Sequence, residues 1–130
     1  MAEPTDEQLK EYAEKLPDVY RTALGAFIQV FDDGTAVRRA GTQVTFSRIT
    51  SDVLELHPAL SEQDVTTILD HLIKAHFIKD VAPFKGLEDY PENQFRRCVP
   101  TPLGERLIAA VTGIEPVPEL IPTLPQPAWA

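Results

Sequence analysis

Cysteine and long apolar runs are both scarce in this chain. Cys98 is the single cysteine among 130 residues, so an internal disulfide framework and a cysteine-rich zinc site are excluded. The longest unbroken apolar run covers residues 107–111, whereas a membrane-spanning helix needs about 20 apolar residues. The acidic start at residues 1–4 has no apolar segment behind it, so we expect no secretory signal. A cytoplasmic protein with no membrane partner is predicted.

Basic residues are also fewer than acidic residues in this chain. The chain has 12 Lys and Arg against 20 Asp and Glu, a net charge of -8, and its pI is about 4.8. This balance argues against tight non-specific binding to nucleic acid, which depends on neutralising phosphates. Residues 34–113, with ten acids and nine bases, are nearly neutral between two acidic ends. Any basic surface must therefore be small.

The usual catalytic and metal-binding motifs are missing. The sequence contains no Gly-rich phosphate loop, nucleophile elbow or HExxH motif. His71 and His76 are five residues apart, so they do not share a helix face. Cys98 lies in the predicted strand from Phe95 to Val99 and is most simply a small core residue. We predict that the chain is not an enzyme and holds no cofactor and no metal.

Two helices are predicted over residues 5–31. Thr5 and Gln8 have the spacing of a capping box, which marks the start of the first helix. Pro17 ends or bends this helix. A second apolar stripe runs from Val19 to Phe31, and Asp32-Asp33-Gly34 is expected to close it. Residues 34–41 are predicted to be a loop.

Two further helices are predicted in the middle of the chain, after a very short strand near residues 44–46. The first begins at Ser47 and ends at His57-Pro58. The second is capped by Ser61, with Asp64 three residues later. Its buried stripe is expected to comprise Val65, Ile68, Leu69, Leu72 and Ala75.

An extended segment from Phe77 and a returning strand at residues 95–99 enclose a turn-rich loop at 83–94. Thr101 is expected to cap a last helix, with Pro102 at its first position and Gly113 at its end. The final segment, 114–130, is rich in proline and is either an extended arm or a disordered linker. Its apolar residues favour an arm that lies across its own domain or a neighbouring subunit.

The two central helices are joined by about four residues around Pro58, the spacing of a helix-turn-helix, and a hairpin follows directly. At residues 61–78 and 98–107 the chain resembles a winged helix-turn-helix domain of the bacterial transcription-regulator type. The first segment looks like a recognition helix running into a wing strand. The second is similar to the Leu-Thr-Pro-Leu-Gly phrase that follows the wing in several regulator families.

The resemblance covers roughly residues 42–113 and implies a mainly α fold with a small antiparallel β-hairpin. The winged-helix domain would be 1–113, with an extra N-terminal helix and a proline-rich C-terminal arm at 114–130. Its parts would be N-terminal helices at 5–31, a helix-turn-helix at 47–76, a wing at 77–100 and a last helix at 101–113.

The resemblance also implies a DNA-binding regulator whose helix from Ser61 enters the major groove. Base contacts would come from Gln63, Thr66, Thr67, His71 and Lys74. Phosphate contacts would come from Arg48, Arg96, Arg97, Arg38 and Arg39. Arg38 and Arg39 have an alternative, which is to pair locally with Asp32 and Asp33.

Carboxylates on the same helix, at Glu62, Asp64 and Asp70, repel phosphates. They leave open a second function, a winged-helix module that binds another protein and no DNA. A homodimer is expected, because the N-terminal helices have more apolar surface than a small core needs and regulators that read two half-sites are commonly dimeric. In the second function, the apolar N-terminal helices or the tail would be the docking surface. The dimer residues would be Tyr20, Phe27, Val30, Phe31 and Trp129, although core packing is the alternative for the helix residues.

Overall fold

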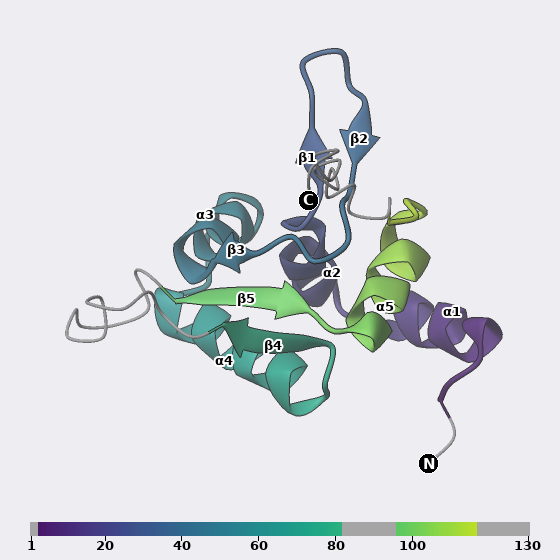
Figure 1. Ribbon diagram of the computed structural model, residues 1–130. Coiled ribbons are helices and arrows are strands. Elements are labelled where there is room, and N and C mark those ends of the chain that lie inside the picture. Colours follow the sequence, from purple (N-terminus) through teal and green to yellow (C-terminus); the bar gives the residue numbers. More distant parts are fainter. Residues whose placement is uncertain (1–2, 82–95, 117–130) are drawn as a thin grey trace, which may run out of the picture.

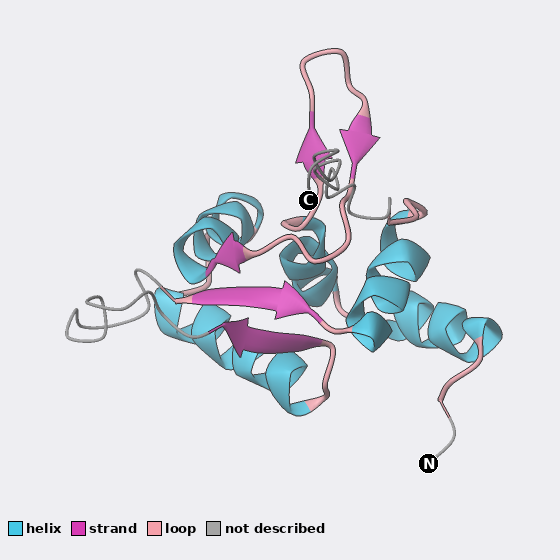
Figure 2. Cartoon of the chain, viewed as in Figure 1, coloured by secondary structure: helices cyan, strands magenta, loops and turns pink. Residues whose placement is uncertain are grey.

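The computed structural model describes residues 3–81 and 96–116 of the chain, and Figure 1 shows the arrangement of their elements. This described part is mainly helical, with small antiparallel sheets (Figure 2). The helices are α1 (Asp6–Lys15), α2 (Asp18–Gly25), α3 (Phe46–Leu56), α4 (Glu62–Lys74) and α5 (Pro102–Thr112). The mainly α fold with an antiparallel hairpin is therefore confirmed.

Three of the predicted helix starts, at Thr5, Ser61 and Thr101, are confirmed by side-chain caps. The start predicted at Ser47 is wrong, because Thr45 caps α3 and Phe46 is its first residue. Thr5 and Gln8 form a reciprocal capping box at α1, and Ser61 does the same with Asp64 at α4. Each box satisfies backbone N–H groups that the first helical turn leaves without a partner. Thr101 caps α5, which ends at Gly113 in the left-handed conformation with φ 73°.

A three-stranded antiparallel sheet packs beside α4. Its strands are β3 (Val44–Thr45), β4 (Ile78–Val81) and β5 (Arg97–Pro100), in the order β3-β5-β4. In this register Cys98 lies opposite Val44 on one side and Asp80 on the other. Cys98 is fully buried, as expected for a small core residue. Because successive strand residues point to opposite faces, Arg97 lies on the sheet face that points away from the core.

The prediction for the second helix was wrong at its C-terminal end. Helix α2 ends at Gly25, and β1 (Gln29–Val30) pairs with β2 (Ala36–Val37) in a separate hairpin, which projects at the top of Figure 1. Phe31, the first residue after β1, accepts a hydrogen bond from the Gly34 amide at 2.9 Å, and its own amide donates to the Thr35 carbonyl at 2.9 Å.

The predicted end of the second helix was wrong because the turn at Asp32-Asp33-Gly34 suits a hairpin as well as a helix end. Asp33 Oδ1 accepts a hydrogen bond from the Thr35 amide at 2.9 Å, and Gly34 takes φ 86°, a conformation that glycine adopts without cost. Val30 and Phe31 are also residue types enriched in strands. The loop predicted at 34–41 accordingly contains strand β2.

The core joins all five described helices to the sheet. Its fully buried side chains include Leu24, Phe46, Ile49, Leu69 and Leu107. Helix α1 packs along α5, α2 along α3, and α3 along α4. In α4 the stripe of Val65, Ile68, Leu69 and Leu72 is buried as predicted, whereas Ala75 is exposed.

Three sequence predictions lie outside the described residues. They are the loop at 83–94, most of the tail at 114–130, and Trp129 as a dimer anchor.

Candidate nucleic-acid interface

Helix α4 presents a polar stripe on the side opposite its buried face. Gln63, Thr67, Asp70 and Lys74 follow one another at steps of four, three and four residues, so they align along one side of the helix. Gln63, Thr67 and Lys74 are exposed. We call these four residues the α4 stripe. Sequence reasoning named three of its members as base-contacting residues and placed Asp70 outside that set.

The other two predicted base-contacting residues are held by contacts within the protein. Thr66 is half-buried and its hydroxyl donates to the Glu62 carbonyl at 3.1 Å, whereas Thr67, which makes the equivalent bond to the Gln63 carbonyl at 3.0 Å, is exposed. His71 Nδ1 lies 2.7 Å from the Tyr20 hydroxyl, and the two rings are stacked with centroids 6.4 Å apart. His71 thus links α4 to α2 at one edge of the α4 stripe.

Arg96, a predicted phosphate contact, instead connects three elements. Its Nε and Nη2 atoms donate to the two Asp80 carboxylate oxygens at 2.9 and 2.8 Å, and Nη2 lies 3.7 Å from Asp70 Oδ1. Its guanidinium also stacks on the Phe46 ring, 4.3 Å from the centroid. The hydrogen bonds to Asp80 are the main cause that raises the pKa of Arg96. The side chain therefore fastens the start of β5 to β4, α4 and α3.

Two basic side chains share the outer face of the small sheet. Arg97 pairs with Val81 and Lys79 with Val99 across β4 and β5, so both lie on the face opposite Cys98. Arg48, in the first turn of α3, is exposed. Lys79 was missed at the sequence level because the face of a strand residue depends on its register.

The prediction that Arg38 contacts DNA is wrong. Arg38 is 1 % exposed and forms an ion pair with Glu105 of α5. Its Nη2 also donates to the Glu105 carbonyl at 2.8 Å. An arginine is buried here because a carboxylate meets its charge and a carbonyl accepts from one of its donors, although Nε is buried without a hydrogen-bond partner. Arg39, the next residue, is exposed.

The four described residues that were predicted to form a dimer interface differ in exposure. Phe27 is 3 % exposed and belongs to the core, so its assignment to an interface is wrong and the alternative of core packing holds for this residue. Tyr20 is half-buried. Val30 and Phe31, on the β1–β2 hairpin, are 67 % and 46 % exposed.

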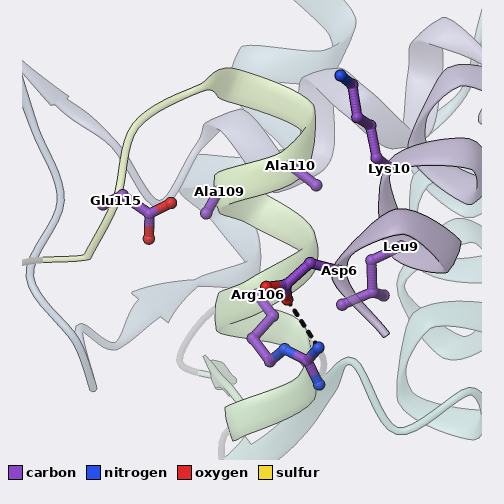
Figure 3. Close-up of a pocket in the computed structure, with 7 residues that line it drawn as sticks. All are labelled: Asp6, Leu9, Lys10, Arg106, Ala109, Ala110 and Glu115. Atoms are coloured by element: carbon purple, nitrogen blue, oxygen red, sulfur yellow. Dashed lines mark hydrogen bonds and ion pairs between the residues drawn. The ribbon is translucent and has the colours of Figure 1, made fainter. Parts of the chain in front are cut away.

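A hollow of about 310 Å³ lies between α1 and α5 (Figure 3). Its lining mixes charges of both signs: Asp6, Leu9, Lys10, Arg106, Ala109, Ala110 and Glu115. Arg106 already donates to Asp6 Oδ1 and to the Pro4 carbonyl, both at 2.8 Å. In Figure 3 the Lys10 amine points away from that ion pair. The hollow is therefore a contact between two helices rather than a site with one ligand chemistry.

Within residues 3–81 and 96–116, no group of three His, Cys, Asp or Glu side chains lies close enough to hold a metal ion. In the same ranges, each helix is too short or too polar to cross a membrane. Comparison with protein families, characterised proteins and solved structures finds no match to this chain. Its function must therefore be argued from its own residues.

Proposed function

We propose that the chain is a small winged-helix regulator that binds double-stranded DNA with α4 in the major groove. The observation that supports this proposal best is the α4 stripe, which stays exposed along a helix whose other side is anchored in the core. The order of elements also fits: α3, a short turn, α4 and then the antiparallel pair β4–β5. A major groove about 12 Å wide admits one α-helix.

The basic residues on α4, on α3 and on the outer face of the sheet set the expected strength of binding. Lys74 on α4, Arg48 on α3 and the pair Arg97 and Lys79 on the sheet supply the positive charge. Each phosphate that a protein neutralises adds about one unit to the slope of log K against log salt. A slope of about -3 to -4 is therefore expected, together with modest affinity.

A fluorescence anisotropy titration of mixed-sequence duplexes between about 50 and 200 mM salt tests the proposal. Arg48→Ala should weaken binding to all sequences and reduce the slope by about 1. Lys74→Ala should weaken binding and also relax the base preference at one position. Lys10→Ala is the matched control, because Lys10 lies on α1 and faces the hollow against α5. Absence of binding at low salt, or equal losses in all three variants, contradicts the proposal.

The second candidate function is a winged-helix module that binds protein and no DNA. The exposed apolar side chains of Val30 and Phe31, on a hairpin that projects from the domain, favour it. Such side chains commonly mark a contact with another protein. In this function, as in the first, the chain is expected to form a homodimer through these two residues.

Light scattering of Val30→Ser and Phe31→Ser tests the hairpin interface, whereas the anisotropy titration with DNA separates the two functions. If the hairpin joins two copies, both variants should be monomeric where the unaltered chain is dimeric. Lys74→Ala should leave the dimer intact. A dimer that survives both serine substitutions contradicts the hairpin interface, whether or not DNA is bound.

A further inference from the structure

Asp70 lies near the middle of the α4 stripe, between Thr67 and Lys74. Its side chain is 46 % exposed. On a helix that enters the major groove, this position faces base edges. A carboxylate there is repelled by the phosphates on either side. On a DNA-binding face, a hydrogen-bond donor on a base offsets that repulsion.

Within the protein, Arg96 contacts two carboxylates, those of Asp70 and Asp80, and its contact with Asp70 is the longer one. Arg96 Nη2 is 3.7 Å from Asp70 Oδ1, but it is 2.8 Å from Asp80 Oδ2. Asp80 and the Phe46 ring thus orient the guanidinium, and Asp70 is a secondary neighbour. The arginine offsets part of the negative charge of Asp70 and leaves the carboxylate able to accept a further hydrogen bond.

The major-groove edges of the four bases differ in what they offer a carboxylate. Cytosine presents its N4 amino donor, guanine presents only acceptors, and thymine presents an acceptor and a methyl group. Adenine presents one donor beside an acceptor, which repels a second carboxylate oxygen. Cytosine is therefore the base that best suits a side chain able only to accept.

We propose that Asp70 determines sequence specificity by accepting a hydrogen bond from the N4 amino group of a cytosine. This inference rests on the proposed binding of DNA by α4. Lys74, one helical turn further on, is a donor for the O6 or N7 atom of a nearby guanine. The two side chains together select a site that contains both a cytosine and a guanine.

The experiment first selects duplexes from a randomised pool with the unaltered chain. Anisotropy is then measured on four duplexes that differ at the position facing Asp70. The unaltered chain should prefer cytosine by about tenfold. Asp70→Asn should shift the preference to adenine, because an amide can donate to N7 and accept from N6. Asp70→Ala should bind all four duplexes within about twofold of one another.

Glu62→Gln is the matched control, since it also removes one negative charge from α4 but lies off the stripe. It should raise affinity for all duplexes and keep the preference for cytosine. If Asp70→Asn and Asp70→Ala both keep the preference of the unaltered chain, Asp70 does not read the base, although DNA binding stands. If neither the unaltered chain nor Glu62→Gln binds any duplex at low salt, the proposed function fails and this inference fails with it.

Discussion

The guanidinium of Arg38 lies against the carboxylate of Glu105, 67 residues further along the chain. The arginine side chain is 1 % exposed and the glutamate 14 %. Glu105 also accepts a hydrogen bond from the Gly41 amide at 3.1 Å. Burial lowers the pKa of Arg38, and the charge of Glu115 acts in the opposite direction. This pair fastens the segment after the β1–β2 hairpin to α5.

Breaking this ion pair should be one of the most destabilising single changes in the domain. Arg38→Ala leaves the Glu105 carboxylate without its cation, and the expected loss is about 3–5 kcal/mol of unfolding free energy. Urea denaturation followed by circular dichroism measures it. Arg39→Ala, at the exposed neighbouring position, should change stability by less than about 0.5 kcal/mol. Equal effects of the two substitutions would show that the buried pair is not structural.

Gly104 should tolerate no side chain. A Cβ atom there would lie 1.7 Å from the Phe77 carbonyl oxygen, so either α5 or the start of β4 must move. Gly104→Ala is expected to cost at least about 2 kcal/mol. Gly25→Ala is the control, because a Cβ at that helical position meets nothing within 4 Å and should be neutral or stabilising by up to about 1 kcal/mol. Thermal melts of the two variants should therefore shift in different directions or by clearly different amounts.

The Cys98 thiol should be unreactive in the folded protein. Burial raises its pKa to about 12, so the thiol stays protonated at pH 8, and the thiolate is the reactive form. Labelling with a maleimide should proceed only at the rate at which the domain unfolds, and addition of urea should restore fast labelling. Rapid labelling of a fully folded sample would contradict the burial of this side chain.

Acid should weaken the turn of the β1–β2 hairpin at a pH below the usual range for aspartate. The backbone hydrogen bond from Thr35 is the main cause that lowers the pKa of Asp33 from its ordinary value of 3.8. The stabilisation of the turn by the Asp33 carboxylate is therefore complete above pH 3.8, and it is lost as the pH falls through the lowered pKa of Asp33. The Thr35 amide resonance, followed by NMR, should titrate in that lower range. In Asp33→Asn this titration should disappear.

Local signals were sufficient to locate most helices. Thr5, Ser61 and Thr101 each act on an amide three residues away, so their effect is contained in a short stretch of sequence. The apolar spacing from Val65 to Leu72 likewise indicates the buried side of α4 without any other information. The same periodicity placed Gln63, Thr67 and Lys74 on the exposed side. The binding of DNA by that side stays a prediction.

The β1–β2 hairpin shows where local signals fail. The apolar residues from Val19 to Phe31 fit a helix throughout, but the turn at Asp33 and Gly34 also permits strand pairing. The choice depends on whether Phe27 packs in the core, which is a long-range contact. Propensity is a weak guide when tertiary packing decides between two local structures.

The sequence by itself determined the helix boundaries set by caps, the buried side of α4 and the absence of a disulfide framework, because these depend on residues close together in the chain. Tertiary structure alone decided that Arg38 is buried, that Arg96 joins β4 to α4, and that Lys79 shares a face with Arg97. Each of these depends on which distant carboxylate or strand lies alongside. Charge by itself does not tell an arginine that binds a partner from one that holds the domain together.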